Sequence, residues 1–169
     1  PMLFTHLNAP WEPFLSGPQG MIAGLGYPSD SPQATANLRL LPGADAQVAN
    51  DAVSRYVAEK WNAQRMVQEI AKAAAWAQRY RVKLVCTEFG TLRHSLDATS
   101  RNLWLRDVRT AMESAGVGWS VWDYADFFGI AIATGSTSTT ADGVVIPRDR
   151  LNPARQFDAG NLAALGLTP

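Results

Sequence analysis

Residues Lys83–Gly90, with the sequence KLVCTEFG, decide how the rest of the chain is interpreted. The run from Leu84 to Thr87 carries no charge, and Glu88 follows it directly. An apolar run of this length, bounded by polar residues, is typical of a buried strand in a parallel sheet. Glu88 would then lie at the carboxyl end of the strand, which is where α/β folds place their functional groups. The alternative is a helix cap or a surface acid that ends an ordinary strand.

Helical periodicity precedes and follows this stretch. Across Asn62–Tyr80 the apolar residues recur at spacings of three and four, which predicts an amphipathic helix. Val53–Trp61 is predicted to form an earlier helical turn or to extend that helix. A second helix is expected over about Ala98–Ala115, with Asp97 or Ser100 as its N-cap.

Strands are expected on both sides of these helices. Met2–Thr5 is predicted to form a strand that leads to His6, and Gly118–Trp122 a further short strand. Asp142 and Gly143 could form the turn of a hairpin, and Asp158–Leu165 a last amphipathic helix. The alternation of strands and helices predicts parallel strands that are covered by helices.

A long irregular segment separates the first strand from the first helix. From Leu7 to about Asp51, prolines and glycines recur too densely for a long helix or a central strand. The segment contains Trp11, Phe14 and Tyr27, which a disordered linker would tend to lack. It is therefore interpreted as an ordered loop at the mouth of a site, and a disordered flap is the alternative.

Composition narrows the classes of partner. The chain has 169 residues, of which 47% are hydrophobic and 18% charged, and its 15 basic and 15 acidic residues give no net charge. Bulk charge therefore favours neither nucleic acid nor an anionic membrane, and no apolar run reaches the ~20 residues of a membrane span. The single cysteine, Cys86, excludes an intramolecular disulfide and is expected in the core. Two histidines, His6 and His94, are too few to predict a zinc site, and no metal or cofactor is expected.

Three stretches together resemble a known family. PMLFTHLNAPW at residues 1–11, KLVCTEFG at 83–90 and GWSVWDYADFFGI at 118–130 are similar to the last three strand ends of a cellulase-type enzyme of glycoside hydrolase family 5. These enzymes are retaining β-glycosidases on a (β/α)8 barrel. The resemblance implies an α/β fold of the TIM-barrel type with about the last three βα units. Residues 1–169 would then be the C-terminal portion of one catalytic domain.

The resemblance also implies roles for single residues. Glu88 corresponds to the catalytic nucleophile, Trp122 to the tryptophan that stacks on the sugar, and His6 to a histidine at the tip of the sixth strand. The family often has a tyrosine two residues beyond that histidine, where this chain has Asn8. Trp11 could extend the sugar platform, whereas strand alternation favours core packing for Trp119. His6 could orient Glu88, contact a sugar hydroxyl or be a satisfied histidine at a strand end.

A retaining glycosidase needs a second carboxyl group as general acid/base, ~5–5.5 Å from the nucleophile. In this family it is a glutamate that follows an asparagine at the end of the fourth strand. No other glutamate of the chain has that context; they are Glu12, Glu59, Glu69 and Glu113. A full barrel takes ~250 residues, so the first five strands are expected outside this chain. The isolated chain is then predicted to be inactive, and to self-associate or to require an N-terminal half.

Three hypotheses about function follow. The first is an endo-acting β-1,4-glucanase that works by double displacement. The second is a related barrel hydrolase acting on mannan or β-1,3-glucan, and the third is a non-catalytic carbohydrate-binding half-barrel. All three predict a polysaccharide or oligosaccharide partner, and neither nucleic acid nor a membrane. A polymeric substrate implies a secreted or periplasmic protein, although the sequence opens without a signal peptide.

Overall fold

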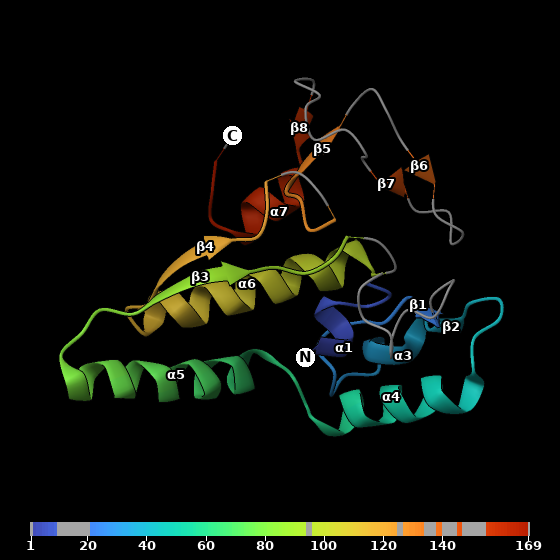
Figure 1. Cartoon of the computed structure of the whole chain (residues 1–169), viewed down its shortest axis with the longest axis horizontal. Helices are drawn as coiled ribbons and strands as arrows, with labels where there is room; N and C mark the ends of the chain where they lie inside the picture. Colours follow the sequence, from blue (N-terminus) through green and yellow to red (C-terminus); the bar gives the residue numbers. More distant parts are fainter. Residues whose placement is uncertain are drawn as a thin grey trace.

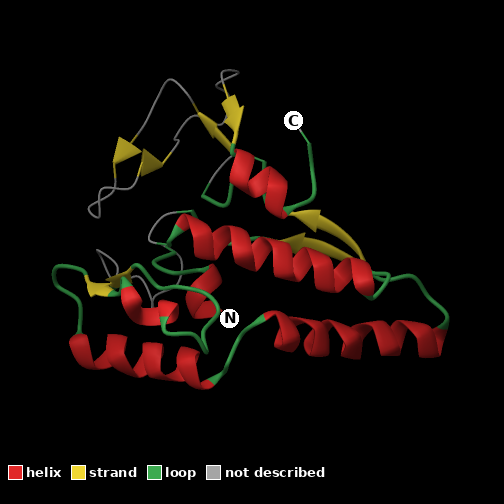
Figure 2. Cartoon of the chain, turned by 180° about the vertical axis from the view of Figure 1, so that it is seen from behind, coloured by secondary structure: helices red, strands yellow, loops and turns green. Residues whose placement is uncertain are grey.

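A parallel pair of strands with its connecting helix organises the fold. The computed structural model describes residues 2–9, 21–93, 96–124, 127–133, 138–139, 145–146 and 155–168. Strands β3 (Val85–Phe89) and β4 (Gly118–Val121) are parallel neighbours, joined by helix α6 (Ala98–Ser114). The two opposite views in Figures 1 and 2 show α6 covering one face of this sheet. Helix α5 (Ala63–Tyr80) packs along α6 (Figure 1).

The predicted order of helix, strand, helix and strand is confirmed over this part. Helix α5 begins after Asn62, whose side chain accepts a hydrogen bond from the backbone N–H of Arg65. Helix α6 begins after Asp97, whose carboxylate accepts from two backbone N–H groups, including that of Ser100. Asp97 is therefore the N-cap. Gly116 follows α6 with φ +68°, a left-handed conformation that glycine adopts without strain.

The expectation that Lys83–Glu88 is a buried strand is wrong. Val85 is 60% exposed and Glu88 is exposed as well, while Phe89 is the residue of β3 that reaches the core. Cys86, which was expected in the core, is only partly buried. Among the described residues, β3 is paired along one edge only and covered by a helix on one face. Its remaining face and edge therefore meet solvent.

The first predicted strand is a helix. Met2–Thr5 forms the short helix α1, so the described residues contain two parallel strands where three were expected. A strand must find partners for its backbone N–H and C=O groups on a neighbouring strand, whereas a helix satisfies them within the segment. Because β3 pairs with β4 alone in the described part of the chain, this segment has no parallel neighbour.

Of the segment predicted to be irregular from Leu7 to about Asp51, the described part from residue 21 onward is more regular than predicted. Strands β1 and β2 form an antiparallel pair, and two helices flank β2. Helix α4 begins at Ala46, with Asp45 as its N-cap, and a break at residues 59–62 separates it from α5. The bounds of these elements are β1 Ile22–Ala23, α3 Gln33–Ala36, β2 Arg39–Leu40 and α4 Ala46–Ala58.

Aromatic residues tie this segment to the core. Phe4 of α1 is fully buried and stacks on Tyr56 of α4, with ring centroids 6.1 Å apart. Tyr27, from the segment interpreted as an ordered loop, is buried too, and its hydroxyl donates to the Asp107 carboxylate of α6 at 3.0 Å. The Tyr56 hydroxyl donates to the Gly26 carbonyl oxygen at 2.9 Å. Burial raises the pKa of both phenols, and Asp107 adds to the effect at Tyr27.

The C-terminal part consists of short antiparallel pairs and one helix. Strand β5 pairs with β8, and β6 with β7. The predicted last helix is confirmed as α7, with Leu162 and Leu165 buried and Asp158 as N-cap. The predicted turn at Asp142 and Gly143 lies outside the described residues. The elements are β5 Ala131–Ala133, β6 Ser138–Thr139, β7 Val145–Ile146, β8 Arg155–Phe157 and α7 Ala159–Ala164. In the described part of the chain, every helix is too short or too polar to cross a membrane.

Candidate functional site

The carboxyl ends of β3 and β4 lie against each other. The backbone N–H of Trp122 donates to the Phe89 carbonyl oxygen at 2.8 Å. Gly90 comes so close to the Trp122 backbone that a Cβ at position 90 would lie 2.0 Å from the Trp122 carbonyl oxygen. Glycine is therefore required at this junction. The chain segments that carry Glu88 and Trp122 are thus held in direct backbone contact.

Glu88 lies at an irregularity of β3. Cys86 pairs with Trp119, and Phe89 pairs with Val121. Between these two pairs β3 contains one residue more than β4, which is a β-bulge. Such bulges redirect side chains and occur next to active sites. The Glu88 side chain is exposed, and its carboxylate makes no hydrogen bond or ion pair to another residue in the described ranges. Its oxygen atoms are thus open to a ligand.

Trp122 and Trp119 differ in their surroundings. Trp122, directly after β4, is 49% exposed and presents an apolar ring surface at the same end of the sheet as Glu88. Trp119 packs edge-on against Phe89, with centroids 5.6 Å apart, and its indole N–H donates to Glu113 at 3.2 Å. The expectation that Trp119 packs against the core is confirmed. Trp122 is the tryptophan whose position suits a ligand.

The segment of His6 touches the loops that follow both strands. The Thr5 carbonyl oxygen accepts a hydrogen bond from the backbone N–H of Leu92, after β3, at 2.9 Å. The half-buried His6 ring lies edge-on to the ring of Phe128, after β4, with centroids 5.6 Å apart. The structure therefore brings the three predicted segments together. Trp11, the remaining predicted binding residue, lies outside the described residues.

Asn8, which stands where the resembling family often has tyrosine, has a structural role. Its side-chain N–H donates to the Ile22 carbonyl oxygen at 2.6 Å, and its side-chain oxygen accepts from the Met21 backbone N–H at 3.0 Å. Asn8 thus ties the His6 segment to β1.

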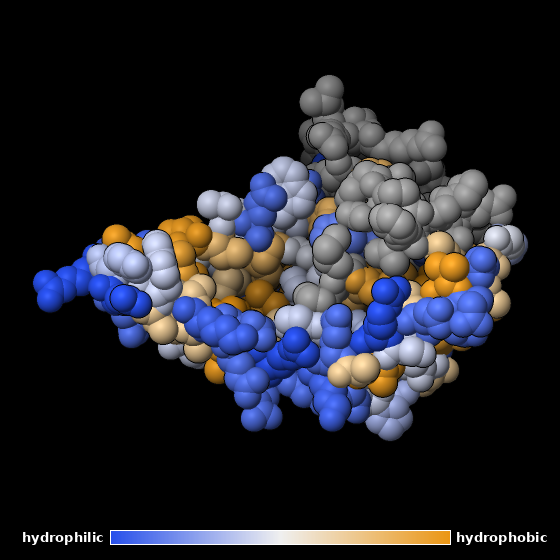
Figure 3. Space-filling view, turned by 60° about the horizontal axis from the view of Figure 1, so that its bottom comes forward, coloured by the Kyte–Doolittle hydropathy of each residue, from blue (hydrophilic) through white to orange (hydrophobic). Residues whose placement is uncertain are grey.

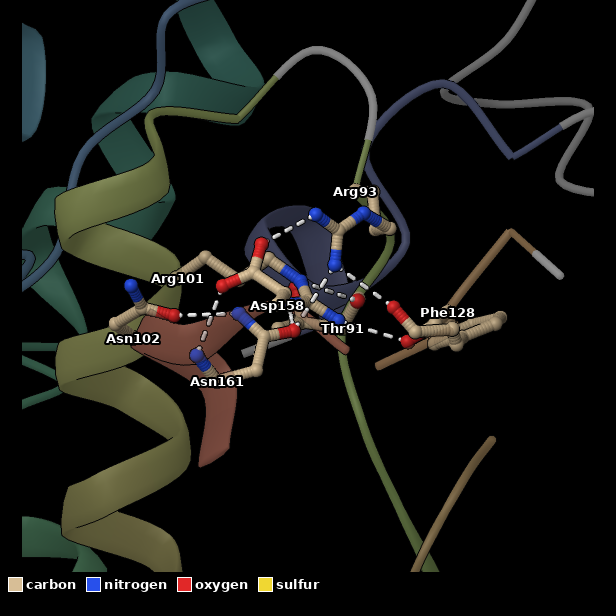
Figure 4. Close-up of polar contacts among 8 residues, drawn as sticks. Thr91, Arg93, Arg101, Asn102, Phe128, Asp158 and Asn161 are labelled. Carbon is tan, nitrogen blue, oxygen red and sulfur yellow. Dashed lines mark hydrogen bonds and ion pairs between the residues drawn. The ribbon is translucent and has the colours of Figure 1, made fainter. Parts of the chain in front are cut away.

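A buried guanidinium group on α6 joins the loop after β3 to the loop after β4. Arg101, in the first turns of α6, is 3% exposed. It donates to the Thr91 carbonyl oxygen after β3 at 3.2 Å and to the Phe128 carbonyl oxygen after β4 at 2.7 Å. A third hydrogen bond goes to the side-chain oxygen of Asn161 in α7. Figure 4 shows these contacts converging between the helices and the loops.

Arg93 adds a second, partly buried layer to this network (Figure 4). It forms an ion pair with Asp158 at 2.6 Å and donates to the Gly129 carbonyl oxygen and the Asn161 side-chain oxygen. Burial by itself raises the pKa of Asp158. Hydrogen bonds from Arg93 and the Asn161 backbone N–H, together with the charges of Arg93 and Arg101, outweigh burial and hold that pKa below its usual value. Asp158 is therefore an ionised anchor between α7 and the loop after β3.

Sequence reasoning missed this network, although one signal for it existed. The signal is the position of Arg101, one helical turn before Leu105 on the apolar stripe of α6. A residue on that stripe is expected to be buried. A buried guanidinium needs several acceptors. Their source, the carbonyl groups of two distant loops, is visible only in the folded chain.

The other glutamates that the structure describes lie away from Glu88. Glu59 caps the end of α4 and accepts from the indole N–H of Trp61 at 2.5 Å, and Glu69 pairs with Lys72 on α5. Glu113 lies in the last turn of α6, near the start of β4 and at the opposite end of the sheet. Glu12 lies outside the described residues. Among the described residues, no group of three or more His, Cys, Asp or Glu side chains could hold a metal ion.

Comparison with known proteins places the fold. No family model matches the chain, and no curated protein matches it either. Among solved structures, an endoglucanase matches 96% of the chain and 36% of its own length, with a TM-score of 0.56 and 18% identity. Thermotoga maritima Cel5A in complex with cellobiose matches 96% of the chain and 35% of its own length, with a TM-score of 0.51 and 17% identity. A hyperthermophilic endo-β-1,4-glucanase in complex with substrate matches 98% of the chain and 36% of its own length, with a TM-score of 0.50 and 19% identity. The chain therefore has a cellulase-like fold, and it spans about a third of the length of these endoglucanases.

Proposed function

We propose that this chain carries the nucleophile of a retaining glycoside hydrolase that cleaves β-1,4-glucan. The observation that carries the proposal is the exposed Glu88 carboxylate at the end of β3, beside the exposed Trp122 at the end of the neighbouring parallel strand. The cellulase-like fold supports it, because such folds place their chemistry at the carboxyl ends of the strands.

The chemistry is a double displacement. A Glu88 oxygen attacks the anomeric carbon, the glycosidic bond breaks, and the departing oxygen takes a proton from a general acid. Water, deprotonated by the same group as base, then hydrolyses the glycosyl ester and frees the Glu88 carboxylate. In this scheme Trp122 stacks on the C–H-rich face of a sugar ring, and His6 orients Glu88 or contacts a sugar hydroxyl.

The acid/base group is proposed to come from a segment outside this chain, because no other glutamate of the sequence follows an asparagine, as the acid/base of the resembling family does, and none of the described ones lies at this end of the sheet. Exposed apolar residues fit a surface that further barrel strands would cover. Val82 and Val85 are both exposed, and Figure 3 shows hydrophobic surface in a hollow behind a polar band. A polymeric substrate further implies a secreted or periplasmic protein.

Binding of cellotetraose, measured by isothermal titration calorimetry, tests the sugar platform. Trp122→Ala is expected to weaken binding about 30-fold or more, since a tryptophan that dominates a binding surface contributes about 2 kcal/mol or more. Trp76→Ala is the matched control, because Trp76 is 55% exposed but lies on α5 against Tyr80. Equal losses in both variants, or none, would contradict the role of Trp122. Titration with mannotetraose and laminaritetraose separates β-1,4-glucan from the alternative substrates.

A further inference from the structure

Arg101 occupies the space between the two loops that follow the candidate site residues. Thr91, whose carbonyl oxygen it binds, stands three residues after Glu88, and Phe128 stands six residues after Trp122. The guanidinium itself is anchored on α6, the helix that supports the sheet. One buried side chain thus binds the backbone of both loops.

We propose that Arg101 is a positioning residue that sets the placement of Trp122 relative to Glu88. The proposal rests on the proposed function only for its consequence in sugar binding; the placement itself is a property of the fold. Arg101 acts through the backbone of the loops.

An arginine suits this task for a geometric reason. Its planar guanidinium offers five N–H donors in a fixed arrangement. Arg101 uses them toward three acceptors that belong to three different parts of the chain. A lysine ammonium at the same position keeps the charge, but it is a point donor without this fixed fork. It is expected to serve one loop and leave the other carbonyl group without its partner.

Helix α7 fixes the orientation of the guanidinium. The Asn161 side-chain oxygen accepts from both Arg93 and Arg101, and its amide N–H donates to the Asn102 side-chain oxygen at 2.6 Å. Because Asn161 is itself buried, its amide cannot turn to solvent. Two guanidinium groups, one from α6 and one from the loop after β3, are thereby held against one acceptor. Asn161 is therefore a second support for the orientation of the Arg101 guanidinium.

A purely structural role for Arg101 makes a different prediction, and the two can be separated. Loss of a buried hydrogen bond anywhere on α6 lowers stability, but only loss of the bonds to Thr91 and Phe128 should displace Trp122. Tyr27→Phe is the matched control. It removes the buried hydrogen bond to Asp107, which is also on α6.

The test uses ¹⁹F NMR of the chain labelled with 5-fluorotryptophan, with the Trp122 resonance assigned through Trp122→Phe. In Arg101→Lys and Arg101→Met, the Trp122 resonance is expected to shift and broaden while the resonance of the exposed Trp76 stays in place. In Tyr27→Phe, the melting temperature is expected to fall with the Trp122 resonance unchanged. If the methionine variant does not fold, the lysine variant decides alone.

An unchanged Trp122 resonance in the folded Arg101 variants, or an equal change in Tyr27→Phe, would overturn the proposal. The affinity for cellotetraose tests the consequence for sugar binding separately. Arg101→Lys is expected to weaken binding about tenfold relative to Tyr27→Phe, since small displacements of positioned groups have large effects. If the wild-type chain binds no cellotetraose, the proposed function fails, while the ¹⁹F comparison still tests the positioning role.

Discussion

β-1,4-Glucan incubated with the purified chain should yield no new reducing ends. The departing sugar oxygen is a poor leaving group unless it is protonated, and a positioned general acid contributes typically about 10²–10⁴-fold to the rate. Of the glutamates that the structure describes, Glu88 alone lies at the end of the sheet where the proposed nucleophile sits. The double displacement needs a second carboxyl group as acid/base, and this group is proposed to lie outside the chain, so both steps are expected to be lost.

The control for this measurement is Glu88→Gln, which should be as inactive as the wild-type chain. The outcome that would contradict the expectation is clear turnover by the wild type that Glu88→Gln abolishes. The general acid/base would then lie within this chain, and the proposal of an external acid/base group would be wrong.

Gly90→Ala should disrupt the junction that holds Glu88 beside Trp122. A Cβ at position 90 would lie 2.0 Å from the Trp122 carbonyl oxygen and 3.3 Å from a ring carbon of Phe128. Backbone on both sides of the contact must move, so the loss of stability is expected at the upper end of the about 1–3 kcal/mol typical of overpacking. Urea denaturation measures the free energy of unfolding.

Gly118→Ala offers the matched control in the same sheet. There the new Cβ would lie 3.3 Å from a terminal methyl group of Val85, a side chain exposed enough to move aside. Gly118→Ala is therefore expected to change the free energy of unfolding by less than Gly90→Ala. Similar losses for both would show that the close approach at position 90 has no special role.

Local sequence signals predicted the helices and strands that depend on local interactions. Helix α5 follows from its apolar spacing, and helix α6 from its candidate N-caps, of which Asp97 is the one that caps the helix. Burial of β3 was not predictable in the same way. An apolar run indicates a strand that can be buried, but whether it is buried depends on which elements lie against it. The segment Met2–Thr5 illustrates the same limit, because it is helical where no parallel neighbour pairs with it.

The sequence predicted the individual residues of the candidate site but not the bulge and the hydrogen-bond network that position them. Glu88, Trp122 and His6 were singled out from the sequence, and the structure brings their segments together. The roles of these residues remain predictions. The bulge at Glu88 depends on the pairing of two strands, and the network around Arg101 depends on loops far apart in the sequence. Neither leaves a local pattern.

The nucleophilic role of Glu88 is tested most directly by mass spectrometry of the chain after incubation with 2,4-dinitrophenyl 2-deoxy-2-fluoro-β-cellobioside. Dinitrophenolate leaves without protonation, so formation of the ester requires no general acid. A Glu88 oxygen would bond to the anomeric carbon as the phenolate departs with its electron pair, and the fluorine slows hydrolysis of the product. We expect one added fluorocellobiosyl group on the peptide that contains Glu88, and none in Glu88→Gln. A group on another residue, or an unmodified wild-type chain at saturating reagent, would contradict Glu88 as the nucleophile.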